Sequence, residues 1–149
     1  MLRLVYLAHK LYCFFVRPLT LGVRVMMIRD RKVLLVRHTY INGWYMPGGG
    51  VKRNETLDQA ARREAREEVG AELVEFSFVG AYTNFTEWKS DHNILFLSTV
   101  FTLDGKDDRE IAEARFFPLD ELPADLWAGH RHLLDEYRSG QVHKMFGEW

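Results

Sequence analysis

Three glutamates lie close together in one short stretch of the chain, residues 49–71. Glu64, Glu67 and Glu68 follow one another at the spacings i, i+3 and i+4, which brings side chains together on one face of an α-helix. Carboxylates about 6 Å apart repel each other by about 3 kcal/mol at an effective dielectric constant near 20. A cation that prefers oxygen ligands would relieve this repulsion, and Mg²⁺ and Mn²⁺ are such cations.

The neighbouring residues predict the helix that carries these glutamates. Thr56 is a residue type that caps helix N-termini, Leu57 opens the helical pattern, and Gly70 stands where a C-terminal cap belongs. On a helical wheel the glutamates fall beside Leu57 and Ala61, and not among the arginines. This is unusual, because an amphipathic helix ordinarily keeps its carboxylates on the solvent-exposed face.

A plainer interpretation of the same residues is a solvated acidic helix face balanced by arginines. Arg63 precedes Glu67 by one helical turn and fits this interpretation. Arg62 faces another arginine, Arg66, and does not fit it. Taken alone, the three glutamates therefore leave both interpretations open.

The glycine-rich turn and the helix together resemble the signature box of the Nudix hydrolases over its whole length. The residues that carry this resemblance are glycines and charged residues at fixed separations: Gly49, Glu55, Arg63, Glu64, Glu67, Glu68 and Gly70. Ala65 and Ala71 stand where the family usually has a larger aliphatic residue, and Asn54 stands where a glycine often precedes the first glutamate. These departures concern local packing and remove no chemical group from the box.

The resemblance implies a fold, an activity and a cofactor. It implies an α/β fold, a Nudix-type α/β/α sandwich with a mixed β-sheet, in which the box forms a loop–helix–loop. We therefore expect a Nudix hydrolase domain over residues 18–149, preceded by an amphipathic helix over 1–17. Nudix enzymes hydrolyse the pyrophosphate of a nucleoside diphosphate linked to another group and use divalent cations, here Mg²⁺ or Mn²⁺.

The resemblance also implies a role for each carboxylate of the box. Glu67, Glu68 and the backbone carbonyl of Gly48 are the expected metal ligands. Glu64 is expected to act as general base, or as a further ligand that helps to hold the attacking water. Such a site would neutralise phosphate oxygens and aim a water molecule in line with the bond that breaks.

Other box residues are expected to support these groups. Arg63 is expected to orient a glutamate through a charge-assisted hydrogen bond, with Glu55 as its partner. Gly49, Glu55 and Gly70 are expected to be structural.

Residues outside the box are weaker site predictions. A glutamate outside the box can contribute in this family, and Glu110 is our first choice and Glu113 our second. Arg37, Tyr40 and Trp44 are predicted to bind substrate, with the arginine reaching a phosphate oxygen and a ring stacking on a base or sugar. The plain alternatives are an exposed charge in a turn for each glutamate and ordinary packing for the aromatic group.

Composition limits the class of protein and its partners. The chain has 149 residues and a formal net charge of −1, so we expect one domain with a sizeable core and no long nucleic acid partner. The only cysteine, Cys13, excludes an internal disulfide and fits a reducing, cytoplasmic location. Scattered histidines without a Cys-x-x-Cys pair argue against a zinc site.

The first sixteen residues predict an amphipathic helix. Leu4, Leu7, Leu11 and Phe15 recur at helical spacing, and the segment is too short and too charged to span a bilayer. Three hypotheses stay open for it: packing on the domain, a homodimer contact, or contact with a membrane surface. Packing and dimerisation are the default expectations.

The rest of the chain is predicted to be rich in strands, with no internal repeat. Strands are expected over 21–28, 32–38, 72–83, 93–103 and 111–118, a polar loop over 84–91 and a charged turn over 104–110. A helical region is expected over 119–137, followed by a tail over 139–149 that is either loose or docks late. Substrate specificity is expected to lie in the loops 39–44 and 85–91.

Three functions from two classes are consistent with these observations. The leading hypothesis is a divalent-metal-dependent pyrophosphohydrolase that acts on a small nucleotide derivative, with a nucleoside diphosphate sugar or an ADP-ribose-like compound preferred. A nucleoside triphosphate pyrophosphohydrolase is the alternative. A non-catalytic nucleotide-binding module is disfavoured, because all charged positions of the box are present.

Overall fold

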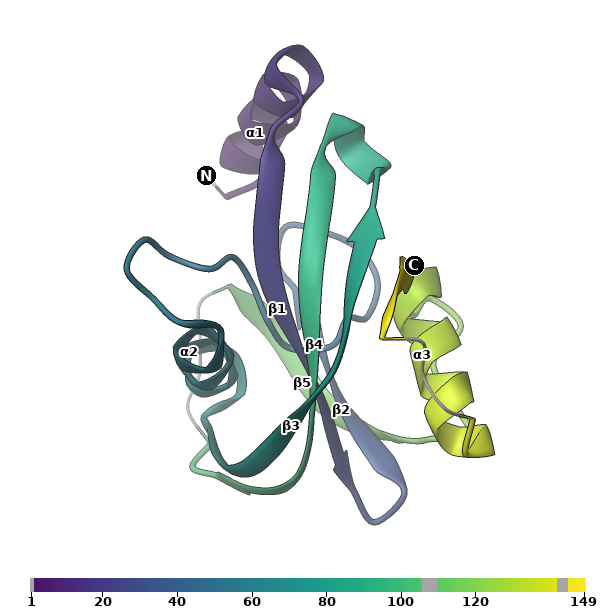
Figure 1. Cartoon of the computed structure of the whole chain (residues 1–149). Coiled ribbons are helices and arrows are strands. Elements are labelled where there is room, and N and C mark those ends of the chain that lie inside the picture. Colours follow the sequence, from purple (N-terminus) through teal and green to yellow (C-terminus); the bar gives the residue numbers. More distant parts are fainter. Residues whose placement is uncertain (1, 106–109, 142–144) are drawn as a thin grey trace.

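The computed structural model describes residues 2–105, 110–141 and 145–149. In chain order, its elements are α1 (Leu2–Val16), β1 (Leu19–Arg29), β2 (Lys32–His38), α2 (Leu57–Val69), β3 (Ala71–Asn84), the 3-10 helix η1 (Thr86–Trp88), β4 (Ser90–Leu103), β5 (Ile111–Pro118), α3 (Ala128–Ser139) and β6 (Phe146–Glu148). The strands form one mixed sheet in the order β5-β2-β1-β4-β3-β6. Figure 1 shows α2 and α3 on opposite faces of this sheet.

A separate hydrophobic core fills the space on each face of the sheet. Beneath α2, the small side chains Ala60, Ala61 and Ala65 are fully buried, which lets the helix lie close to the strands. Beneath α3, Leu133 and Leu134 pack on a second cluster from the opposite face. The predicted α/β/α sandwich with a mixed sheet is therefore confirmed.

Strands β1 and β2 pair only next to their hairpin turn, at Ile28 and Arg29, and then separate. The segment over 44–51 enters the space between them. Its carbonyls at Pro47 and Gly49 each accept a hydrogen bond of 2.9 Å from the backbone of β1. On the other side, Tyr45 exchanges two backbone hydrogen bonds with β2. This double pairing fixes the glycine-rich turn in the middle of the sheet.

The predicted caps of α2 are both present. Thr56 and Gln59 form a capping box, in which each side chain accepts a hydrogen bond from the other residue's backbone N–H. Gly70 ends the helix in the left-handed conformation, with φ of 62°. The helix therefore begins and ends where the sequence predicted, and its register places the glutamates against the glycine-rich turn.

One prediction in the C-terminal third is wrong. The helix begins at Ala128 and not near residue 119, because the backbone of Asp125 and Trp127 pairs with Trp44 instead of continuing a helical ladder. Of the two alternatives for the tail, its last residues show the docked one: β6 adds to the sheet beside β3, and the Trp149 ring stacks on Tyr82 at 5.5 Å. The predicted charged turn over 104–110 lies largely outside the described residues.

The predicted loop over 84–91 is shorter than expected, because β3 and β4 run into it from both ends. It narrows to η1 and its flanks, between Asn84 and Ser90. Helix α1 lies beside this tip, away from α2 and α3 (Figure 1). The first sixteen residues are thus a helix, as predicted, but one placed at the end of the sheet.

Helix α1 presents its apolar face to solvent. Leu4, Leu7, Leu11 and Phe15 are each 59–74% exposed, whereas Cys13 on the opposite face is 1% exposed. A helix that packs on its own domain would bury the leucine face. No helix among the described residues is long and apolar enough to cross a membrane.

Candidate active site

Two glycines allow the glycine-rich turn to lie against its neighbours. Gly48 has φ of +144°, and a Cβ there would lie 2.1 Å from the carbonyl oxygen of Val23. A Cβ on Gly49 would lie 2.6 Å from Oε1 of Glu64. Any larger residue would therefore push the turn away from β1 or from the carboxylate, so the two glycines bring backbone and glutamates together.

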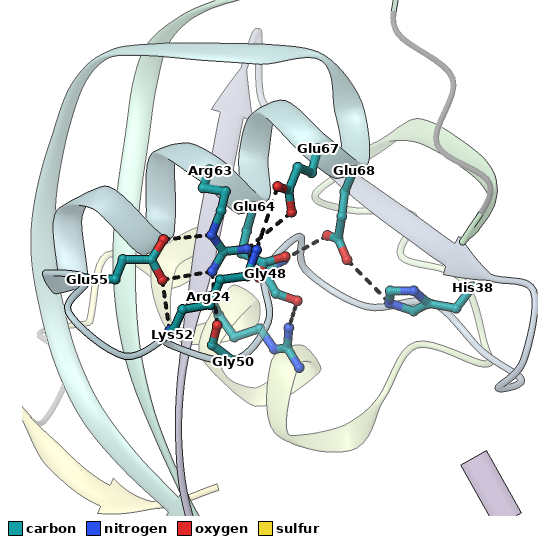
Figure 2. Close-up of polar contacts among 10 residues, drawn as sticks. All are labelled: Arg24, His38, Gly48, Gly50, Lys52, Glu55, Arg63, Glu64, Glu67 and Glu68. Atoms are coloured by element: carbon teal, nitrogen blue, oxygen red, sulfur yellow. Dashed lines mark hydrogen bonds and ion pairs between the residues drawn. The ribbon is translucent and has the colours of Figure 1, made fainter. Parts of the chain in front are cut away.

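Glu68 is buried directly beneath this turn. Its Oε2 accepts a hydrogen bond of 2.8 Å from the Gly48 N–H, and its Oε1 lies 3.9 Å from Nε2 of His38 at the end of β2. The Gly48 carbonyl, an expected metal ligand, accepts a hydrogen bond from the guanidinium of Arg24. Figure 2 shows these groups converging on the turn.

Arg63 joins the remaining carboxylates of the box (Figure 2). It donates to both oxygens of Glu55, at 2.6 and 2.9 Å, and to Glu64 and Glu67 at 2.5 and 3.2 Å. A further bond of 3.0 Å reaches the carbonyl of Gly50. The expected pairing of Arg63 with Glu55 is thus present, and the same guanidinium also holds two of the predicted metal-site glutamates.

These contacts shift the pKa values of Glu55 and Arg63. The hydrogen bond from Arg63, helped by the Lys52 backbone N–H, lowers the pKa of Glu55 to about 2 from an ordinary value of 4.5. The same bond to Glu55, supported by Glu64 and Glu67, raises the pKa of Arg63. Both groups are therefore fully charged at neutral pH.

The donor set fits a divalent cation by chemistry, although its oxygens are not gathered around one point. Glu64, Glu67, Glu68 and the Gly48 carbonyl offer only oxygen ligands, which suit Mg²⁺ and Mn²⁺. Across residues 2–105, 110–141 and 145–149, no three His, Cys, Asp or Glu side chains stand close enough to hold a metal ion. Arg63 binds the Glu64 and Glu67 carboxylates through one nitrogen, whereas Glu68 is held separately by the Gly48 N–H.

A cleft of about 360 Å³ adjoins the box, and Arg24 and His38 line it on the side nearest the glutamates. Five further aromatic side chains line it: Tyr6, Tyr40, Tyr45, Trp127 and Trp149. The other lining residues are polar apart from Ile41: Asn84, Thr86, Glu87, Lys89, Asp91, Asn93 and His130. Aromatic faces with a few fixed polar groups are typical of a site for a nucleoside or a sugar.

The structure separates the three predicted substrate-binding residues. Tyr40 lines the cleft, and burial together with the charges of Glu110 and Glu68 raises its pKa to about 12, so its hydroxyl stays protonated. Trp44 lies instead in the core, 2% exposed. Arg37 stacks on this ring at 4.6 Å. Neither Arg37 nor Trp44 lines the cleft.

The two glutamates proposed from outside the box differ in position. The Glu110 carbonyl accepts a hydrogen bond of 2.9 Å from the Thr39 N–H, and the charge of Glu110 acts on Tyr40 at the cleft. The Glu113 carboxylate forms ion pairs with Arg37, at 4.0 Å, and with Arg115. The first choice thus lies nearer the cleft than the second.

Several cleft residues were not predicted from the sequence. Arg24 occupies an ordinary strand position, and the Tyr6 and Trp149 side chains come from opposite ends of the chain. His130 is fully buried, which together with the charge of Arg24 lowers its pKa, and its Nδ1 accepts a bond of 3.0 Å from the Met46 N–H. None of these residues lies within a recognisable spacing pattern, so only the fold reveals them.

Comparison with known proteins agrees with this fold and site. The sequence matches the NUDIX domain over residues 18–137. The chain therefore belongs to the NUDIX domain family, and its class is that of a Nudix pyrophosphohydrolase.

Three curated relatives illustrate what the chain is similar to. An ADP-ribose pyrophosphatase of Methanocaldococcus jannaschii is 29% identical over 133 residues, covering 86% of this chain and 78% of the relative. An NAD-capped RNA hydrolase, NudC, of Pseudomonas aeruginosa is 33% identical over 127 residues, which is 78% of this chain but only 44% of that protein. A putative 8-oxo-dGTP diphosphatase of Bacillus subtilis is 24% identical and is covered over 81% of both chains.

A solved structure supports the fold alone. The MutT protein from Methanosarcina mazei Go1 superimposes with a TM-score of 0.75 at 22% identity, covering 84% of this chain and 96% of that one. Helix α1 lies outside the residues matched to the family, and so does the C-terminal segment that carries Trp149.

Proposed function

We propose that the chain is a divalent-metal-dependent hydrolase that cleaves the pyrophosphate bond of a nucleoside diphosphate linked to another moiety. The observation that carries this proposal is the placement of Glu68 and Glu64 against the glycine-rich turn. Two residues that line the cleft contact this unit, since Arg24 donates to the Gly48 carbonyl and His38 lies 3.9 Å from Glu68. A diphosphate at this point would lie beside the carboxylates, with a nucleoside or sugar in the cleft.

Each group of the site has a proposed task. Glu67, Glu68 and the Gly48 carbonyl would hold Mg²⁺ or Mn²⁺, and the bound ion would supply positive charge to neutralise the diphosphate oxygens. Glu64 takes the proton of the attacking water as oxygen adds to phosphorus and the bridging P–O bond breaks. Arg63 keeps these carboxylates oriented.

We favour a nucleoside diphosphate sugar or an ADP-ribose-like substrate over a nucleoside triphosphate. The similarity to an ADP-ribose pyrophosphatase supports this choice. The similarity to a putative 8-oxo-dGTP diphosphatase supports triphosphate cleavage as the second candidate.

The proposal is tested by hydrolysis of ADP-ribose and of ATP with and without Mg²⁺ or Mn²⁺, using mass spectrometry of the products. We expect cleavage only with metal, with ADP-ribose preferred. The substitution Glu68→Gln keeps the shape of the side chain and should lower kcat at least about 100-fold while the melting temperature stays unchanged.

The matched control is Glu72→Gln, the same change just beyond α2, where the carboxylate is half exposed and pairs with Arg66. It should leave the activity unchanged. Near-normal turnover by Glu68→Gln would overturn the metal assignment. Nucleotide binding without any metal-dependent hydrolysis by the unaltered chain would instead establish a non-catalytic binding module.

A further inference from the structure

A second hollow continues the cleft beneath α1. It measures about 410 Å³ and is lined by Tyr6, Lys10, Tyr40, Ile41, Asn42 and Glu87. Four of these residues also line the first cleft: Tyr6, Tyr40, Ile41 and Glu87. The two hollows are therefore neighbours that meet at these side chains, and the binding space continues past the cleft as far as the N-terminal helix.

A polar contact between α1 and η1 marks the junction of the two hollows. The Tyr6 hydroxyl donates a hydrogen bond of 2.5 Å to Oε1 of Glu87, and Nζ of Lys10 lies 3.1 Å from the same oxygen. The Tyr6 ring also packs on Tyr40, with centroids 5.7 Å apart. Two residues of one helix thus fix the position of one carboxylate.

The backbone of η1, which carries this carboxylate, is strained. Glu87 has φ of 56° and Trp88 has φ of 57°, a left-handed conformation that costs roughly 1 kcal/mol or more per residue for non-glycine residues. Such strain persists only where surrounding contacts enforce it. Helix α1 supplies such contacts, since Phe14 also packs edge-on against Trp88 at 5.3 Å.

The Glu87 carboxylate is charged at neutral pH. Burial by itself raises the pKa of this carboxyl, but hydrogen bonds from Tyr6 and Lys10 and the nearby lysine charges outweigh burial and lower it. The Tyr6 hydroxyl keeps its proton, because burial and the neighbouring glutamate raise its pKa. The junction therefore offers a fixed anionic acceptor to whatever occupies the hollows.

The orientation of α1 agrees with a role at this junction. The helix turns Tyr6, Lys10 and Cys13 toward the domain and leaves its leucines in solvent. Among its described side chains it thus directs polar groups inward, which hydrophobic packing alone would not produce. It also lies outside the residues matched to the family.

We propose that α1 completes the substrate site, and that Tyr6 positions Glu87 to accept hydrogen bonds from hydroxyl groups on the moiety beyond the diphosphate. This inference rests on the function proposed above and deepens it, because it names the substrate class and two residues that select it. A sugar offers hydroxyl donors to a fixed carboxylate, whereas an ionised terminal phosphate offers only acceptor oxygens. Tyr6 positions the Glu87 carboxylate, and this carboxylate selects between the two kinds of substrate.

The test compares Tyr6→Phe with Tyr12→Phe in the full chain. Both substitutions remove one hydroxyl from α1, but Tyr12 is 52% exposed and lines neither hollow. We expect Tyr6→Phe to raise KM for ADP-ribose about fivefold, which corresponds to one lost hydrogen bond, with kcat and the KM for ATP changed by less than about twofold. Tyr12→Phe should change none of these constants.

A second variant tests the carboxylate itself. Glu87→Gln removes the negative charge and should raise KM for ADP-ribose while lowering KM for ATP. The preference of the enzyme for ADP-ribose over ATP should therefore become smaller. Equal KM values for Tyr6→Phe and Tyr12→Phe, or an unchanged preference in Glu87→Gln, would overturn the inference.

Dissociation constants measured with Ca²⁺ in place of Mg²⁺ separate this inference from the proposed function. If Tyr6→Phe weakens ADP-ribose binding and the unaltered chain hydrolyses nothing, the inference stands and the hydrolase proposal fails. If the unaltered chain hydrolyses ADP-ribose and Tyr6→Phe binds it normally, the hydrolase proposal stands and the inference fails. If the unaltered chain neither binds nor hydrolyses ADP-ribose, both fail.

Discussion

At the scale of single residues, Arg63 is expected to affect both the stability of the protein and its activity. The side chain is 17% exposed and contacts Glu55, Glu64 and Glu67 together. One guanidinium therefore offsets the mutual repulsion of three carboxylates, and its loss would leave all three without their shared donor.

We predict that Arg63→Ala lowers both stability and activity. The free energy of unfolding should fall by about 2 kcal/mol, as for hydrogen bonds to charged groups. Turnover should fall because the carboxylates lose their orientation. Arg66→Ala is the control, since this arginine is 58% exposed and pairs with Glu72 at the surface. Equal melting temperatures for the two variants would contradict the role of Arg63.

The pH dependence follows from the same pair. The pKa of Glu55 falls from 4.5 to about 2 on folding, so the unfolded chain binds a proton more readily in this range. The pair therefore stabilises the fold fully above pH 4.5, and this contribution is lost as the pH falls toward 2. The free energies of unfolding of the unaltered chain and of Arg63→Ala, measured with urea, should converge as the pH falls across this interval. A difference that stays constant with pH would exclude the Glu55–Arg63 pair as the origin of this stabilisation.

At the scale of elements, the orientation of α1 is the feature that departs most from ordinary packing. We predict that Leu11→Asp leaves the melting temperature nearly unchanged, because Leu11 is 61% exposed. Cys13→Asp, the same new side chain two residues later, should lower it strongly, because Cys13 is 1% exposed and the new charge would be buried. A larger fall in melting temperature for Leu11→Asp than for Cys13→Asp would mean that the leucine face packs on the domain.

The two remaining hypotheses for the outer face of α1 are separable with the same protein. A homodimer contact through this face predicts that Leu11→Asp elutes later than the unaltered chain in size-exclusion chromatography. Contact with a membrane surface predicts that liposome sedimentation of the unaltered chain is lost on removal of residues 1–17. Equal sedimentation of both forms would exclude the membrane hypothesis.

At the scale of the whole molecule, the two ends of the chain enclose one binding space. Trp149 packs against Tyr82, Trp127 and His130, with ring centroids between 5.2 and 5.5 Å apart, and lines the cleft. Tyr6 reaches the same cleft from α1. Both segments lie outside the residues matched to the family.

We predict that Trp149→Ala lowers the free energy of unfolding by about 2 kcal/mol, since a large, partly buried ring is removed. It should also raise KM for ADP-ribose, because the ring forms part of the cleft wall. Trp88→Ala is the control for stability: this ring is 51% exposed, and its loss should cost less than about 1 kcal/mol. Equal melting temperatures would show that the C-terminal residue is not docked.

Local pattern explains which elements were predicted well. Helix α2, its caps and the strand over Ile111–Pro118 depend on spacing within one segment, and they occur where the sequence indicated. Helix α3 begins later than predicted because its preceding residues pair with Trp44, more than 80 residues earlier in the chain. The ends of β3 and β4 extend further because each strand stabilises the other.

The sequence by itself determined the class of protein, because the glutamates, Arg63 and the glycine-rich turn lie within one turn–helix unit whose spacing fixes their chemistry. Only the tertiary structure decided which residues line the cleft. Tyr6 and Glu87 are 81 residues apart, and Trp44 and Tyr40 are separated into core and cleft by the direction of one loop. Contacts of this kind depend on how β1, α1 and η1 pack together, which no local spacing encodes.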